Sequence, residues 1–180
     1  MMLSNLNALS RHGFKEGQIE NLNQYFNTVK PSASLYKSGL SLLREWENVK
    51  YEIFEYGPYQ GNGNPIQWHM FFIMKNNQIR FPDFELKPIN IWFKMNHFFI
   101  LKGIIFESHP EFNKNYLLTG NEQDVRPIFK KNVLNFFTLT KGMHLAGRNG
   151  KLCFIKKKKI QQTSFQKYLS TSHECYSVFN

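Results

Sequence analysis

The chain has 180 residues, of which 42% are hydrophobic and 16% aromatic, and its 23 Lys and Arg against 13 Asp and Glu leave a formal net charge of +10. This length suits one domain, or one domain with a small appendage, and the apolar fraction is sufficient for a buried core, which argues against a wholly disordered chain. The composition also excludes the collagen-like, coiled-coil and disulfide-rich classes.

The excess positive charge is confined to the last third of the chain. Residues 1–124 carry 12 basic and 12 acidic side chains, whereas residues 125–180 carry 11 basic side chains and one acidic one, Glu174. A local basic field of this kind attracts nucleic acid, anionic lipid or an acidic protein. The alternative is compositional bias, because 18 of the 23 basic residues are Lys in a chain that is also rich in Asn, Phe and Ile.

The sequence carries no export or membrane-spanning signal. Residues 1–14 lack a basic region followed by an apolar one, and the longest mostly apolar stretch, residues 91–106, is interrupted by charged and polar side chains. Cys153 and Cys175 form no C-x-x-C pair, so neither a zinc site nor a thioredoxin motif is predicted. We therefore expect a cytoplasmic protein with reduced cysteines, either free or peripheral to the membrane.

The first 34 residues are predicted to form a helical extension. Apolar side chains at helical spacing within residues 3–26 favour one or two short amphipathic helices, which Gly13 and Gly17 separate. Residues 30–34, KPSAS, are typical of a linker. The predicted organisation is thus an N-terminal extension, 1–34, followed by a single α+β domain, 35–180.

From residue 35 the pattern changes to strands. Aromatic and β-branched residues over 40–46, 49–56 and 66–74 predict an antiparallel meander, with a loop at 57–65. Asn76-Asn77 is expected to make a tight turn into a further strand at 78–81. The segment FPDFELKP, 81–88, is expected to be extended because each residue before a proline is biased away from the helical region.

Helices and a hairpin follow. Asn90 is expected to cap a helix over 91–99 whose aromatic stripe packs in the core or inserts at a membrane surface. Residues 104–106 and 116–119 are short strand candidates, and Asn121 is expected to cap a helix that Pro127 kinks or delays. The turn GRNG, 147–150, predicts a hairpin, and residues 164–179 a last helix. The predicted fold class is α+β, an antiparallel β-meander and hairpin packed with several short helices.

Three motifs resemble those of a family of uncharacterised bacterial proteins. They are FEYGPYQGNG (54–63), FPDFELKP (81–88) and IIFESHPEFNKNYLLTGNEQDVRPIF (104–129), in that order, and the resemblance extends over about residues 35–179. It implies the same fold, with a hairpin and a last helix, and implies no activity or catalytic residue. Glu55 stands where the family often has Asp, and Gly103-Ile104-Ile105 replaces an acidic stretch, which argues against an acidic site there.

Constellations for metal or cofactor chemistry are incomplete. The glycines at 57, 61 and 63 lack the third glycine of a dinucleotide-binding loop. His109 and Glu111 match half of a zinc deaminase motif, whose P-C-x-x-C half is absent, and a structural turn is expected instead. On a helix, His173 and Cys175 would point about 200° apart, too far to share a metal. No cofactor-binding or metal residue is therefore predicted.

Catalytic constellations are equally weak. The carboxylate pairs Glu45/Glu47 and Asp83/Glu85 each lie on one side of an extended chain, and both are expected to face solvent. Cys153 with His144 is conceivable as a nucleophile pair across the hairpin, but no oxyanion motif accompanies it. No catalytic residue is predicted, and an enzyme is less favoured than a binding protein.

The C-terminal lysines supply the candidate binding residues. Two interpretations of the run after residue 155 stay open, protection of a sheet edge from pairing and electrostatic binding of a polyanion, and neither implies sequence-specific readout. The favoured function is a soluble, non-enzymatic binding or interaction module, and the alternative is peripheral association with anionic membrane or nucleic acid. The candidate polyanion-binding residues are Arg148, Lys151, Lys156, Lys157, Lys158 and Lys159.

Overall fold

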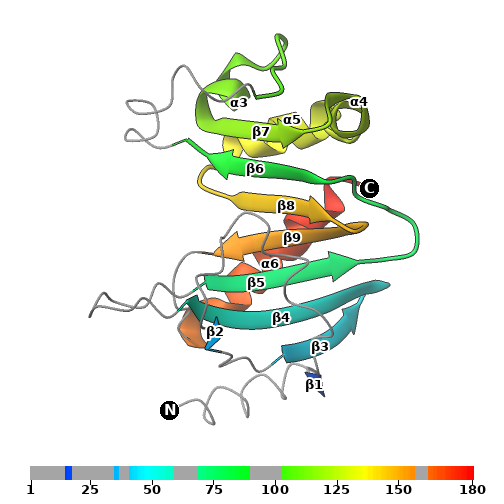
Figure 1. The fold of residues 1–180 in the computed structure, drawn as a ribbon, viewed down its shortest axis with the longest axis vertical. Helices are drawn as coiled ribbons and strands as arrows, with labels where there is room; N and C mark the ends of the chain where they lie inside the picture. The colour runs from blue at the N-terminus through cyan, green and yellow to red at the C-terminus, as the bar shows by residue number, and fades with distance from the viewer. Residues whose placement is uncertain (1–14, 18–34, 37–40, 59–68, 90–102, 157–161) are drawn as a thin grey trace.

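One antiparallel sheet with helices packed on it organises the chain (Figure 1). The computed structural model describes residues 15–17, 35–36, 41–58, 69–89, 103–156 and 162–180. The predicted α+β class is confirmed.

The strands are joined in an order that differs from their order along the chain. They are β1 (Lys15–Gly17), β2 (Leu35–Tyr36), β3 (Ser41–Trp46), β4 (Val49–Pro58), β5 (His69–Lys75), β6 (Phe84–Pro88), β7 (Tyr116–Gly120), β8 (His144–Arg148) and β9 (Lys151–Lys156). The sheet runs β1-β3-β4-β5-β9-β8-β6-β7, and β2 pairs with the end of β4. The hairpin β8–β9 therefore lies between β5 and β6, although β6 follows β5 in sequence.

Two tight turns join neighbouring strands. Glu47 and Asn48 connect β3 to β4 with φ of 50° and 63°, and Asn149 and Gly150 connect β8 to β9 with φ of 51° and 77°. Positive φ at both central residues gives the turn a twist that matches paired strands, and Asn-Gly is the commonest sequence for it. The predicted hairpin at residues 147–150 is confirmed.

The helices are short except for the last. They are α3 (Pro110–Asn115), α4 (Glu122–Val125), the 3-10 turn η2 (Arg126–Ile128), α5 (Lys131–Leu139) and α6 (Gln162–Ser177). Asn121 caps α4 as predicted, because its Oδ1 accepts a hydrogen bond from the Gln123 N–H at 3.0 Å. Pro127 lies in η2, so the predicted helix is interrupted there and resumes as α5.

The two faces of the sheet are packed differently. On the helix face, alternate strand residues such as Phe72, Leu86 and Phe154 form one core with side chains of α5 and α6, which lie behind the sheet in Figure 1. The centre of the opposite face is also buried, but its side chains do not belong to that core. The buried residues of this face are Phe71, Ile73, Glu85, His144, Ala146, Cys153 and Ile155.

Two predicted strands and one predicted helix differ from the structure. Residues 78–81 form no strand; the Asn76 side chain instead accepts hydrogen bonds from the N–H groups of Gln78 and Ile79, which turns the chain away. Residues 104–106 are irregular; Ile104 N–H donates to the Leu118 carbonyl of β7, whereas the Phe106 N–H and carbonyl are bonded to the Asn113 side chain. Lys15–Gly17 was expected among helices but is strand β1, paired with β3. The rest of the predicted extension and the helix after Asn90 lie outside the described residues.

None of the described helices is both long and apolar enough to cross a membrane.

Candidate functional site

The structure places the predicted basic residues at two separate ends of one strand. Arg148 and Lys151 are paired across the β8–β9 turn. Lys156 ends β9, roughly 17 Å away along the strand, and its Nζ lies 4.9 Å from the centre of the Tyr168 ring on α6. Lys157, Lys158 and Lys159 lie outside the described residues.

Protection of a sheet edge does not explain Lys156. The strand that it ends, β9, is flanked by β5 on one side and by β8 on the other, so it is an interior strand. Lys156 itself is paired with Met70 of β5. The edge interpretation is therefore wrong for Lys156, because the C-terminal hairpin is inserted into the middle of the sheet.

Four cationic side chains lie side by side at one end of four adjacent strands. Lys50 of β4 is paired with Lys75 of β5, and Lys151 of β9 with Arg148 of β8. The β5–β9 pairing ends at Met74 and Leu152, and Lys75 and Lys151 are the next residues of these two strands. Paired residues project from the same side of a sheet, so all four lie on the face opposite the helices. We call Lys50, Lys75, Lys151 and Arg148 the basic row.

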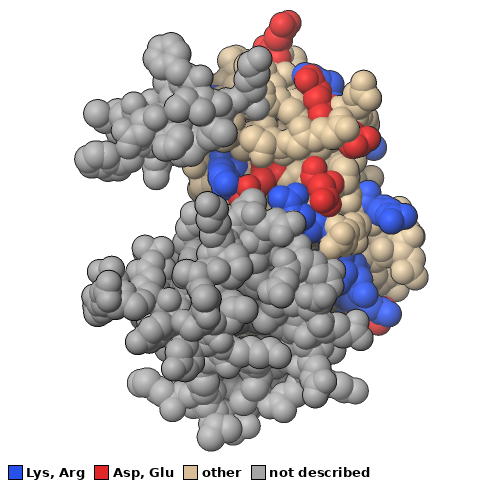
Figure 2. Space-filling view, in the orientation of Figure 1, with Lys and Arg blue, Asp and Glu red and all other residues tan. Residues whose placement is uncertain are grey.

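The basic row is accessible and is bounded by carboxylates. Lys50 and Lys75 are exposed and Lys151 and Arg148 half-buried. Figure 2 looks onto this face, and blue Lys and Arg side chains lie along its right margin. Arg80 adds a fifth cation, since its Cγ would lie 3.0 Å from a Cβ on Gly150.

Three acidic residues accompany the row. Glu45 is paired with Lys50 at one end, and Asp83 accepts a hydrogen bond from the Asn149 N–H at 3.3 Å at the other. Glu52 lies two pairs further into the sheet on the same face, opposite Ile73. Together with Arg80, this region thus holds five cations and three carboxylates, and the four cations of the row are neighbours in the sheet.

The Arg148 guanidinium is held against the sheet. Its Nη1 donates to the carbonyls of Phe84 and Gly147, at 3.2 and 3.0 Å. A guanidinium committed to backbone carbonyls supplies charge at a fixed place rather than a free two-pronged donor.

Further in on the same face, a buried carboxylate joins two strands, β6 and β8. Glu85 on β6 accepts hydrogen bonds from His144 Nε2 at 2.8 Å and Lys87 Nζ at 2.9 Å. Burial by itself disfavours the charged form of Glu85, but these two bonds outweigh it and hold the pKa of the carboxyl below its ordinary value. The expectation that Asp83 and Glu85 both face solvent is wrong for Glu85, which is buried and bonded to the side chains of His144 and Lys87.

The two cysteines are buried thiols. Burial raises the pKa of both Cys153 and Cys175 well above the ordinary value, which disfavours the thiolate that a nucleophile or metal ligand requires. Cys153 is paired with Ala146 rather than with His144, and the one partner found for the His144 ring among the described residues is Glu85. The structure therefore gives the Cys153–His144 pair no support.

His109 orders the start of α3. Its Nδ1 is 2.8 Å from Ser108 Oγ and its Nε2 is 3.2 Å from Asn135 Oδ1 on α5. This arrangement resembles an activated serine. However, the backbone N–H of His109 already donates to the Phe106 carbonyl, and Pro110 has no backbone N–H. Neither residue after Ser108 can then stabilise an oxyanion, which fits the predicted structural turn.

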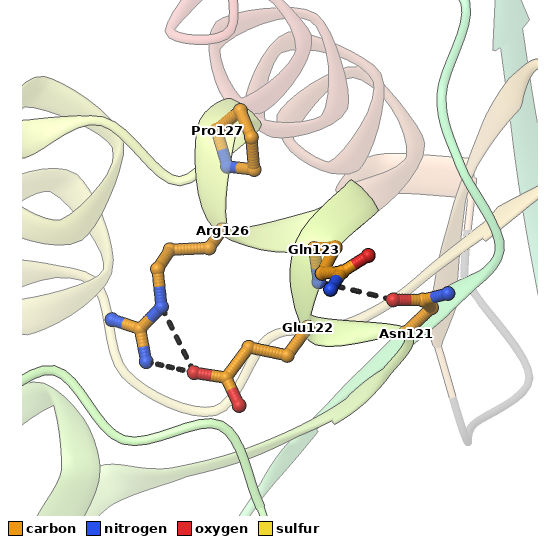
Figure 3. Close-up of a pocket in the computed structure, with 5 residues that line it drawn as sticks. All are labelled: Asn121, Glu122, Gln123, Arg126 and Pro127. Carbon is orange, nitrogen blue, oxygen red and sulfur yellow. Dashed lines mark hydrogen bonds and ion pairs between the residues drawn. The ribbon is translucent and has the colours of Figure 1, made fainter.

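A pocket over α4 and η2 has an open shape. It has a volume of about 830 Å³ and is lined by the residues labelled in Figure 3, which are Asn121, Glu122, Gln123, Arg126 and Pro127. Arg126 is already committed there, to the Glu122 carboxylate, to the Ile105 carbonyl at 3.0 Å and to the face of the Phe106 ring. The two charged side chains of the pocket, Arg126 and Glu122, thus pair with each other rather than converge on a ligand.

A last polar cluster links α6 to the β3–β4 hairpin. The Tyr51 hydroxyl is hydrogen-bonded to His173 Nδ1, and His173 Nε2 lies 3.1 Å from the Glu47 carboxylate. Burial is the largest of the effects that raise the pKa of Tyr51 far above its ordinary value, so its hydroxyl stays protonated in this cluster.

Within the described ranges, no three His, Cys, Asp or Glu side chains gather as a metal site. The chain matches no family model, no curated protein and no solved structure. The resemblance to an uncharacterised bacterial family therefore stays a prediction.

Proposed function

We propose that this protein is a non-enzymatic binding module whose basic row binds polyanions. The observation that carries the proposal is the alignment of Lys50 and Lys75 with Lys151 and Arg148 across four adjacent strands. Like charges directly opposite one another destabilise a sheet, and a bound polyanion would relieve that repulsion. Compositional bias accounts for the number of lysines in the chain but not for this alignment.

The polar clusters elsewhere in the described residues support binding rather than catalysis. Glu85, His144 and Lys87 satisfy one another, and Ser108 lacks neighbouring oxyanion donors. The thiols of Cys153 and Cys175 are kept protonated by burial. The cytoplasmic location expected from the sequence remains part of this proposal.

The proposal is tested with a general polyanion. The triple variant Lys50→Gln, Lys75→Gln, Lys151→Gln removes three charges of the basic row, and Lys130→Gln, Lys131→Gln, Lys167→Gln removes three exposed charges from α5, its N-cap and α6. We expect labelled heparin, titrated at low salt and followed by anisotropy, to bind the wild type and the α5–α6 variant alike and the row variant at least tenfold more weakly. Equal weakening by both triple variants would show that net charge, not the row, binds the polyanion.

A further inference from the structure

The length of the basic row suits a short run of phosphates on one strand of a nucleic-acid duplex. Adjacent strands lie about 4.8 Å apart, so four neighbouring cations span about 14 Å. One strand of a duplex presents a phosphate every 3.4 Å along its axis, so the row faces about four phosphates of one backbone. Glu45 and Asp83 close the row at its two ends and limit the contact to that length.

The surroundings of the row disfavour two other polyanions. Single strands are bound by stacking their bases on aromatic side chains, and no aromatic side chain is exposed where the structure describes exposure. Stable membrane attachment takes an apolar signal besides basic charge. The large apolar side chains found exposed, Ile105 and Leu139, precede α3 and end α5, and neither belongs to a strand of the row.

The side chains of the row predict binding without sequence readout. Three are lysines, which act as point charges on phosphates, and the guanidinium of Arg148 is held by two backbone carbonyls. Arg80 lies outside the row, where its side chain covers Gly150 of the β8–β9 turn. Readout of guanine needs a free two-pronged donor that reaches into the major groove. We infer that the basic row binds the sugar-phosphate backbone of double-stranded nucleic acid independently of sequence, an inference that rests on the proposed polyanion-binding function.

The test uses the full chain with four labelled probes. They are two short DNA duplexes of unrelated sequence, one of their single strands, and vesicles containing phosphatidylserine. We expect the two duplexes to bind equally, and more tightly than the single strand or the vesicles. Because each phosphate contact contributes about −0.9 to the slope of log affinity against log salt, the wild type should give a slope of about −3.6 on duplex.

The two triple variants separate the row from net charge. Lys50→Gln, Lys75→Gln, Lys151→Gln should reduce the steepness of the duplex slope by about 2.7, whereas Lys130→Gln, Lys131→Gln, Lys167→Gln should leave it unchanged. An unchanged slope in the row variant would overturn the inference, as would a marked preference for one duplex sequence. Row-dependent binding of the vesicles or the single strand in preference to the duplex would also overturn it, while leaving the proposed function standing. If heparin too ignored the row, both would fail.

Discussion

Glu85 depends on two neighbouring side chains for its charge. Its side chain is only 6% exposed, while that of Lys87 is 40% exposed, so the inner bond, to His144, is the better protected from solvent. Hydrogen bonds that involve a charged group contribute more than neutral ones, and more when they are shielded. The carboxylate thus ties β6 to β8 in the part of the sheet where the C-terminal hairpin was inserted.

We predict that Glu85→Gln lowers stability at neutral pH by about 2 kcal/mol, which corresponds to a fall in Tm of about 4–8 °C in thermal denaturation. The exposed Glu107→Gln is the control and should change Tm little. A fall of equal size in both variants would contradict a special role for Glu85.

The same carboxylate predicts the response to acid. The pKa of Glu85 is lower in the folded chain than its ordinary value of 4.5, so the unfolded chain takes up the proton first as pH falls. The stabilisation is therefore complete above about pH 4.5 and is lost as pH falls through the folded pKa. In denaturant unfolding at a series of pH values, Glu85→Gln should show a smaller acid loss than the wild type. Parallel pH profiles would contradict this.

At the scale of elements, α6 is fastened to the β3–β4 hairpin by the bonds through His173. The Tyr51 hydroxyl is bonded to one ring nitrogen, Nδ1, and the Glu47 carboxylate to the other, Nε2. Helix α6 also packs through Phe165 onto Phe72, with ring centres 6.0 Å apart. The polar bonds thus fix the rotation of a helix whose burial comes from apolar packing.

We predict that His173→Ala and Tyr51→Phe each cost about 1–2 kcal/mol, and that the double variant costs less than their sum. Urea denaturation of the four proteins measures the coupling between the two side chains, with exposed Lys167→Ala on α6 as the control. Strict additivity would show that the two side chains act independently.

The close approach of β8 and β6 requires a residue without a side chain at position 147. A Cβ on Gly147 would lie 2.2 Å from the Pro82 carbonyl oxygen and 2.5 Å from the Phe84 ring. We predict that Gly147→Ala destabilises by at least about 2 kcal/mol, because backbone cannot move aside as a flexible side chain would. Gly142→Ala is the comparison, since its Cβ meets nothing within 4 Å and its cost is only that of φ +79°. Chemical denaturation of both variants checks the order, and a milder effect at Gly147 would contradict it.

Sequence patterns predicted the elements whose signals are local. The β8–β9 turn follows from Asn149-Gly150, and the start of α4 follows from Asn121, since each depends on a few adjacent residues. The basic row and the burial of Glu85 depend on which strands become neighbours. Lys50 and Lys75 belong to the neutral part of the chain, residues 1–124. No local pattern predicts that β9 pairs with β5 and so brings these lysines beside Lys151 and Arg148.

At the scale of the whole molecule, one late hairpin completes the sheet. Strands β3, β4 and β5 form one antiparallel group and β6 and β7 another, and β8–β9 joins them by pairing with β6 on one side and β5 on the other. Among the described strands, none of the first group pairs with a strand of the second, so the hairpin alone connects them in the sheet. Contacts between segments this far apart in sequence form cooperatively or not at all.

We predict that a chain ending after Thr140 loses cooperative unfolding, because β5 and β6 would each present an unpaired edge and the core side chains of α6 would be gone. The full chain should show one sharp thermal transition by circular dichroism, whereas the truncated chain should melt gradually and self-associate in size-exclusion chromatography. Removal of Asn180 alone, an exposed residue, is the control and should leave the sharp transition unchanged. A truncated chain that stayed monomeric and kept a sharp transition near the original temperature would show that the β3–β5 group folds independently, and that the hairpin is an addition to the fold rather than the element that closes it.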